Sequence, residues 1–167
     1  MKKDTDRRVF VYNRTREVFV ATEVDVADSY GTRLVGLLGK GARWARPGRG
    51  LWIIPSHGVH TIGMLFPIDV IFLDKQHCVI HVEEHMRPFR LSRVLLKAHS
   101  VVELPPHTIF RTGTKVGDEM ELGPINGYPP SILLSAQGAG PRSVIEEQHI
   151  EVSSSQFTTI PAGGSEK

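Results

Sequence analysis

The sequence predicts one small α+β domain, mainly antiparallel β, in which a curled sheet or partial barrel carries one short helix. Short β-branched and aromatic runs recur between residues 9 and 122, separated by Gly, Pro, Asn and Asp, which is typical of strands and turns. Helical spacing of apolar residues occurs in a single segment, residues 28–38. The 167 residues are 40% hydrophobic and 23% charged, as in a globular protein.

The first half of the domain is expected to contain a hairpin, a helix and a loop. Residues 9–12 and 18–24 flank the polar segment 13–16 and predict a β-hairpin. Leu34, Leu37 and Leu38 have helical spacing, and Asp28 or Ser29 can cap the start. We therefore expect a helix over residues 28–38, followed by a Gly-, Arg- and Pro-rich loop over residues 40–50.

Five further strands are expected, over residues 51–54, 66–73, 78–84, 100–104 and 120–122. The second of these is a near-continuous apolar run interrupted only by Pro67 and Asp69, and residues 74–77 form the turn after it.

The predicted domain boundaries are residues 1–8 for an N-terminal extension, 9–123 for the β-rich domain and 124–167 for a tail. The tail is rich in Pro, Gly and Ser, and its apolar islands at 132–134 and 144–145 are too small for a core of their own. Either island could lie along the domain or on a second chain, so a protein partner or a homo-oligomer could form through the tail.

Several classes of function are disfavoured by composition. A formal charge of +2 gives no reason to expect a nucleic-acid partner. The single cysteine, Cys78, permits no internal disulfide. No signal-peptide core or membrane-spanning apolar run is visible. We therefore expect a cytoplasmic protein with no transmembrane segment.

Five stretches carry a family resemblance: TRLVGLLGK (32–40), VHTIGMLFPIDVIFLD (59–74), MRPFR (86–90), VVELPP (101–106) and KVGDEMEL (115–122). In this order and spacing the chain resembles domain of unknown function 192, a family of small prokaryotic proteins without assigned activity. Many members have Trp-Met-Lys-Asn-Thr before the Leu-Asp pair. Here His60 stands at that Trp, Thr61 at the Met and Gly63 at the Asn, a His-Thr-x-x-Met variant. His107 stands where a Gly is usual.

The stretch from residue 59 to residue 74 contains candidate residues for a ligand pocket. A buried carboxylate such as Asp69 must be hydrogen-bonded or paired. The first interpretation is structural, with backbone N–H groups or an arginine (Arg87 or Arg90) as its partners. In the second, Asp69 anchors a pocket formed by six residues: His60, Thr61, Met64, Asp69, Arg87 and Arg90.

The histidines suggest a metal site as an alternative. His57, His60, His81 and His85 could converge with the Met64 thioether to bind zinc or copper. A small metal-binding protein or metal-dependent hydrolase would follow. However, no Cys-x-x-Cys pair or zinc-type spacing is present, so no cofactor is our main expectation.

A third possibility is an anion-binding loop formed by Arg43, Arg46 and Arg49, with Trp44 and Trp52 among them. The alternative is a solvated loop that favours solubility. Acid–base chemistry by Asp69 with Glu103, or a Cys78 nucleophile, would require side chains to meet that the sequence does not bring together. We therefore expect a non-catalytic ligand- or protein-binding module.

Overall fold

Seven strands form a single sheet in the computed structural model, which describes residues 8–29, 31, 37 and 44–125. The described part of the chain is thus mostly β. The elements are β1 (Arg8–Asn13), β2 (Val18–Ala27), β3 (Arg49–Ile53), β4 (Ile68–Leu73), β5 (Val79–Met86), β6 (Ser100–Leu104), α2 (Thr108–Thr112) and β7 (Met120–Pro124).

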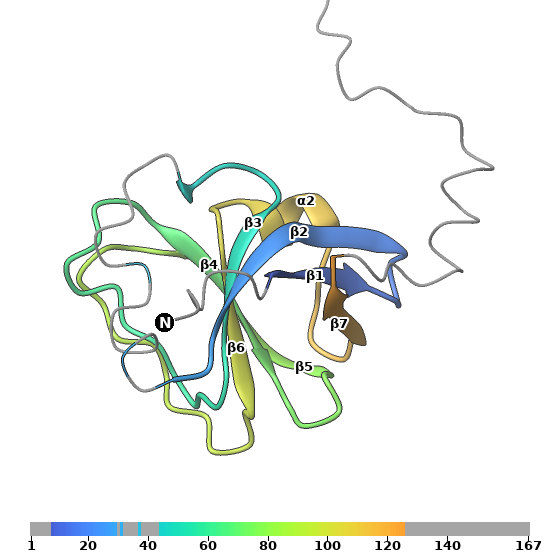
Figure 1. Ribbon diagram of the computed structural model, residues 1–167. Coiled ribbons are helices and arrows are strands. Elements are labelled where there is room, and N and C mark those ends of the chain that lie inside the picture. Colours follow the sequence, from blue (N-terminus) through green and yellow to red (C-terminus); the bar gives the residue numbers. More distant parts are fainter. Residues whose placement is uncertain (1–7, 30, 32–36, 38–43, 126–167) are drawn as a thin grey trace, which may run out of the picture. The chain divides into compact units, whose positions relative to one another are not determined.

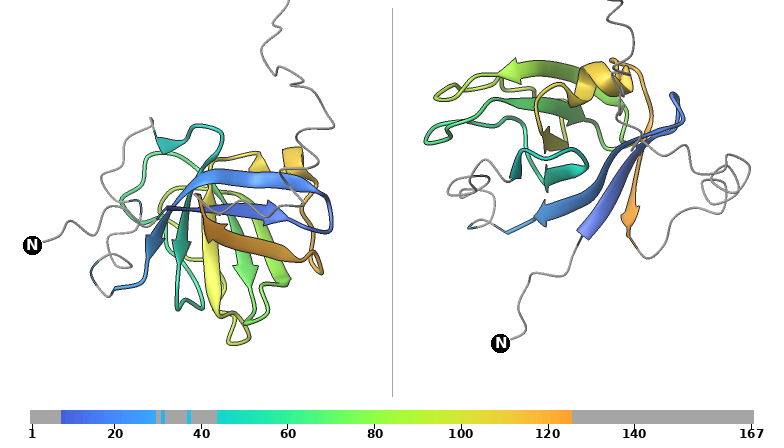
Figure 2. Two further views of the ribbon diagram at one scale, coloured as in Figure 1. Left: turned by 45° about the vertical axis from the view of Figure 1, so that its right-hand side comes forward. Right: turned by 90° about the horizontal axis from the view of Figure 1, so that it is seen from above.

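The strand order is β5-β4-β6-β3-β2-β1-β7, in which β2 and β3 are parallel and all other pairs are antiparallel. The sheet twists and curls strongly (Figures 1 and 2). The residues before one edge strand, β7, reach the start of the other, β5. The Val79 N–H donates to the Asp118 carbonyl at 2.9 Å, and Cys78 pairs with Glu119. These contacts give the predicted partial barrel.

Both faces of the sheet carry a hydrophobic core, and β4 is therefore buried along its whole length. Ile68, Val70 and Phe72 pack on one face with Met64 and Trp44. Ile71 and Leu73 pack on the other face with residues from the hairpin, β6, α2 and β7. A strand buried on both faces has a continuous apolar sequence rather than an alternating one, which is why this strand could be recognised, although it begins at Ile68 and not at residue 66 as expected.

The predicted hairpin and the turn at residues 74–77 are present. Asp74 organises the turn, since its Oδ1 accepts the N–H groups of Gln76 and Cys78 at 2.9 and 2.8 Å. Residues 49–50, expected at the end of a loop, begin β3 instead. Arg8 and Pro124, expected just outside the domain, lie in β1 and β7.

Helix α2 was missed by the sequence-based prediction. It is one turn long, and Gly113 ends it in a left-handed conformation with φ 64°. Pro105 and Pro106 before it and Gly113 after it are start and stop signals, but five residues offer too little periodicity to recognise. The helix expected over residues 28–38 lies largely outside the described residues, as does the tail from residue 126.

By its internal contacts the chain divides into two units, Met1–Pro130 and Ser131–Lys167, of which the second lies outside the described residues. In the described part of the first unit, no helix has the length and apolar character needed to cross a bilayer.

Candidate functional site: the paired-loop surface

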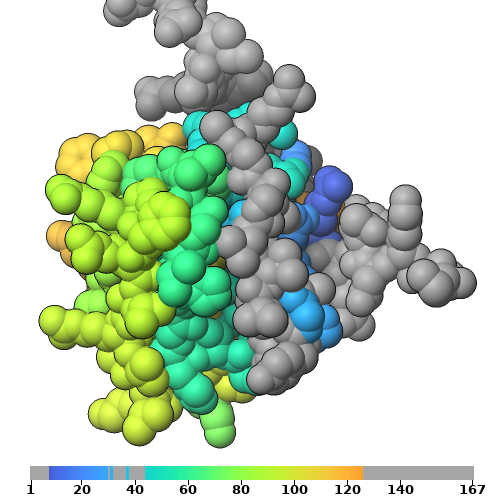
Figure 3. Space-filling view, turned by 90° about the vertical axis from the view of Figure 1, so that its left-hand side faces the viewer, coloured from blue at the N-terminus to red at the C-terminus, as the bar shows by residue number. Residues whose placement is uncertain are grey.

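Two long connections, residues 54–67 between β3 and β4 and residues 87–99 between β5 and β6, lie side by side and are joined by hydrogen bonds (Figure 3). Backbone N–H groups of the second donate to carbonyls of the first, from Phe89 to Thr61 at 2.9 Å and from Leu95 to His57 at 2.8 Å. We define the exposed face of these two connections as the paired-loop surface.

Thr61 is the central link between the two connections and is fully buried. Its hydroxyl donates to the Arg87 carbonyl at 2.7 Å and accepts the Arg90 N–H at 2.9 Å. Its own N–H donates to the Arg90 carbonyl at 2.9 Å. Thr61 therefore holds the second connection in place through the backbone of the two predicted pocket arginines, whose side chains are exposed.

Further links fix the rest of the pair. The Ser92 hydroxyl accepts the Val59 N–H at 2.8 Å, and the His57 Nδ1 lies 2.8 Å from the Ala98 carbonyl. Gly58 lies where the two backbones approach each other closely, since a Cβ there would be 3.1 Å from the Arg93 carbonyl oxygen. The two connections thus behave as one supported layer rather than as two separate loops.

The paired-loop surface exposes more large apolar side chains than any other part of the described chain. Leu65 is 88% exposed, Leu96 is 84% exposed and Phe89 is 63% exposed. Three more residues of the same two connections are exposed, namely Ile62, Leu91 and Val94. Exposed apolar residues gathered in this way mark interaction sites, whereas single ones carry no such meaning.

The remaining predicted pocket residues are divided between the two faces of the sheet. Met64 is buried in the core with Val70. Asp69 pairs across from Leu104, which belongs to the opposite core, so its side chain points to that opposite face. The structure therefore does not bring Asp69 together with Met64 in one pocket.

Asp69 is fully buried and uses both carboxylate oxygens for backbone donors. Its Oδ1 accepts the His85 N–H and its Oδ2 accepts the Ile109 N–H, each at 2.9 Å. These are the backbone partners anticipated by the structural interpretation. The carboxylate fixes α2 and the end of β5 to the middle of the sheet.

The four predicted metal ligands have different neighbours. His57 meets the Ala98 carbonyl and His60 pairs with Leu91. The His81 ring lies 5.4 Å from that of Phe72, and the His85 ring lies 5.3 Å from that of His107. Among the residues that the structure describes, no three His, Cys, Asp or Glu side chains are grouped as metal ligands.

The predicted anion-binding loop is only partly described, because Arg43 lies outside the described residues. Arg49 lies in β3, and its Nη1 is 2.7 Å from the Glu23 carboxylate of β2. Arg46 is exposed at a hollow of about 150 Å³ that Glu23 also lines. Trp44, expected on the loop, is instead buried and stacks on Phe66 with ring centroids 6.1 Å apart.

Neither predicted catalytic arrangement is assembled. Asp69 and Glu103 lie on neighbouring strands, but Glu103 pairs with Val70 and therefore shares the face opposite to Asp69. Burial raises the pKa of the Cys78 thiol, and the carboxylates of Asp74 and Glu119 raise it further. A protonated thiol is a poor nucleophile at neutral pH.

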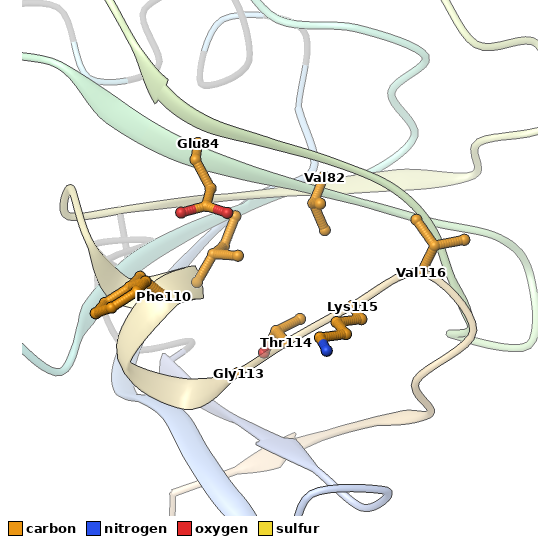
Figure 4. Close-up of a pocket in the computed structure, with 8 residues that line it drawn as sticks. Val82, Glu84, Phe110, Gly113, Thr114, Lys115 and Val116 are labelled. Atoms are coloured by element: carbon orange, nitrogen blue, oxygen red, sulfur yellow. The ribbon is translucent and has the colours of Figure 1, made fainter.

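A hollow of about 470 Å³ lies outside all the predicted sites (Figure 4). It is lined by Val82 and Glu84 of β5 and by Phe110 of α2. Lys115 and Val116 line it from the segment before β7. Sequence reasoning could not find it, because it depends on the way α2 approaches β5.

The exposed apolar residues of the paired-loop surface were also missed. The segment PFRLSRVLLK has a visible signal, since its apolar residues fall between arginines without strand or helix periodicity. The tail, for which partner binding was predicted, lies outside the described residues.

Comparison with known proteins agrees with the resemblance in the sequence. The family model of DUF192, described as an uncharacterized ACR, matches residues 11–122. The UPF0127 protein PH1112 of Pyrococcus horikoshii is 31% identical over 100 residues, which cover 57% of this chain and 83% of that protein.

Two crystal structures share the fold. A candidate transcription regulator from Sinorhizobium meliloti has a TM-score of 0.57 at 21% identity, covering 69% of this chain and 92% of its own. A protein of unknown function from Novosphingobium aromaticivorans has a TM-score of 0.53 at 17% identity, covering 68% and 83%. Because the family match covers residues 11–122, about two thirds of its length, the chain belongs to the uncharacterised DUF192 family.

Proposed function

We propose that this protein is a non-catalytic binding module that holds an apolar partner against its paired-loop surface. The observation that carries the proposal is the set of six exposed apolar side chains on two connections, among which Leu65 and Leu96 are more than four-fifths exposed. Burying one such side chain fully is worth about 1.5–3 kcal/mol, so a partner that covers several of them gains a large driving force.

The support beneath this surface favours binding over accidental exposure. The Thr61 hydroxyl and the backbone hydrogen bonds between the two connections fix both of them in the unbound protein. A surface that is already ordered loses little conformational entropy when a partner arrives.

Phe89 adds a second line of support. Its φ is +58°, a left-handed conformation that costs a bulky residue about 1–2 kcal/mol. The N–H of Phe89 donates to the Thr61 carbonyl, which holds the residue in this conformation while its ring remains 63% exposed. Strained conformations gather at functional sites, and the strain here presents an aromatic ring to solvent.

The proposal can be tested with anilinonaphthalene sulfonate, an apolar dye that carries one negative charge. Titration of the full-length protein, followed by amide NMR, is expected to shift signals of residues 57–66 and 87–97. The variant Leu65→Ser with Leu96→Ser should bind the dye at least tenfold more weakly, because two apolar contacts are lost.

The matched control is Phe110→Ser with Val116→Ser, which removes two exposed apolar side chains of the separate 470 Å³ hollow. Dye binding at the paired-loop surface should be unchanged in this control. Shifts confined to the hollow, or equal losses in both variants, would contradict the proposal.

A further inference from the structure

We propose that the partner of the paired-loop surface is a lipid bilayer with anionic headgroups, an inference that rests on the function proposed above. The juxtaposition that carries it is a set of exposed apolar side chains among exposed cations with no acidic residue on either connection.

The charge of this surface has one sign. Four exposed cationic residues lie on the second connection, namely Arg87, Arg90, Arg93 and Lys97. Neither residues 54–67 nor residues 87–99 include an aspartate or glutamate. The chain as a whole is only +2, whereas the second connection alone carries these four cations and no acidic residue. Such a surface complements an anionic partner.

The apolar residues decide what kind of anionic partner fits. Leu91, Val94 and Leu96 alternate with the cations along the second connection, and Leu65 is the most exposed of the apolar residues on the first. An interfacial anchor needs this combination, because its apolar side chains enter the boundary between headgroups and acyl chains while its basic side chains remain among the headgroups. A free phosphate or a nucleic-acid backbone would use the arginines but leave these leucines in water.

Shape favours a bilayer over an acidic peptide. The leucines at positions 65 and 96 are 88% and 84% exposed, so they project from the surface rather than line a groove. A bound peptide helix needs a groove that receives its apolar face. The 470 Å³ hollow, which could receive a side chain, is formed by β5, α2 and the segment before β7 rather than by the paired connections. A deformable lipid interface accepts projecting side chains directly.

The experiment is sedimentation of the full-length protein with vesicles. One set contains phosphatidylcholine alone, and the other contains equal parts of phosphatidylcholine and phosphatidylglycerol. We expect binding to the mixed vesicles, weaker binding to the neutral ones, and a decline as salt is raised, because salt screens the attraction. Each basic residue close to an anionic surface strengthens binding about fivefold.

Three variants separate the contributions. Arg90→Gln with Arg93→Gln should weaken binding to mixed vesicles about 25-fold while dye binding by the leucines persists. Leu65→Ser with Leu96→Ser should lose binding to both kinds of vesicle. Phe110→Ser with Val116→Ser, the matched control, should bind like the parent.

The outcomes also distinguish this inference from the proposed function. If the dye binds at the paired-loop surface but vesicles of either composition do not sediment the protein, the lipid inference is overturned and the binding module stands. Preference for a soluble amphipathic peptide of glutamate and leucine over vesicles would likewise overturn it and indicate a protein partner. If the dye fails to bind this surface, the proposed function itself is wrong.

Discussion

The Oδ2 of Asp69 accepts the N–H of Ile109 at 2.9 Å, joining the middle of the sheet to the first turn of α2, while its Oδ1 accepts the His85 N–H. In Asp69→Asn, the new NH₂ group would face a backbone donor in a fully buried site. We expect the free energy of unfolding to fall by about 2–3 kcal/mol. Urea denaturation measures this, with the exposed Glu119→Gln as the control. An Asp69→Asn protein as stable as the parent would refute the structural role of the carboxylate.

Thr61→Val tests the link between the two connections. Valine has nearly the same shape but cannot donate to the Arg87 carbonyl or accept the Arg90 N–H. We expect a loss of about 1–3 kcal/mol, together with faster hydrogen exchange of the Phe89 and Arg90 amides. Thr22→Val, at an exposed position of β2, is the control. Unchanged hydrogen exchange in the second connection would show that the backbone hydrogen bonds hold it in place without the Thr61 hydroxyl.

Phe89→Gly separates binding from stability. Glycine adopts the φ of +58° freely, but it also increases the entropy of the unfolded chain. The free energy of unfolding should therefore stay unchanged or rise by up to about 1 kcal/mol. Binding of anilinonaphthalene sulfonate should weaken, because the exposed ring is removed. If Phe89→Gly instead unfolded the protein, the ring would have a packing role that its 63% exposure does not suggest.

Acid stability should depend on Asp118. Burial alone would raise its pKa, but hydrogen bonds from Arg16, Asn13 and the Lys115 N–H, together with the Arg16 charge, hold that pKa below the ordinary 3.8. The folded state therefore binds this proton less readily than the unfolded state does. The resulting stabilisation is complete above the unfolded pKa and is lost as the pH falls through the lower folded pKa.

Asp118→Asn should consequently destabilise the protein by about 1–3 kcal/mol at neutral pH. Below pH about 4 the variant should lose less further stability than the parent does, because it has no carboxylate to protonate at this position. Urea denaturation across this pH range measures both effects. Arg16→Gln should show a milder version, because it removes one of the donors to the carboxylate. Parallel pH profiles of parent and Asp118→Asn would exclude this linkage.

His77 should make a contribution of the same sign as Asp118 but nearer neutral pH, because here the folded state favours the neutral form of the side chain. Burial and the nearby His99 lower its pKa from the ordinary 6.5, and Asp74 only partly offsets this. Its contribution to stability is therefore present above pH about 6.5 and declines as the pH falls toward the folded pKa. NMR titration of the ring should give a value under 6.5. His77→Asn tolerates the φ of 63° and should flatten the decline in stability below pH about 7.

The strands were predictable because their signals are local. Residues 66–73 form an apolar run interrupted only by Pro67 and Asp69, and residues 68–73 of this run form β4, which is buried on both faces. The turn at Asp74 was equally visible, since a short carboxylate side chain can bond backbone N–H groups two and four residues ahead. The need for partners around Asp69 also followed from the sequence, because an unpaired carboxylate in an apolar run is too costly.

The identity of those partners was decided by tertiary structure. Asp69 and Glu103 look like a possible acid–base pair in the sequence, yet the register between β4 and β6 turns them to opposite faces of the sheet. The arrangement of Leu65 with Leu96 has the same origin. These residues are 31 positions apart in the chain, and they belong to two connections that Thr61 and the backbone hydrogen bonds hold together.

By itself, the sequence determined the strands, their turns and the family, since short-range periodicity and turn chemistry specify them. Only the tertiary structure decided which polar residues are architectural and which apolar residues remain exposed. That decision depends on hydrogen bonds and sheet registers between segments distant in the chain, and no local pattern encodes these pairings.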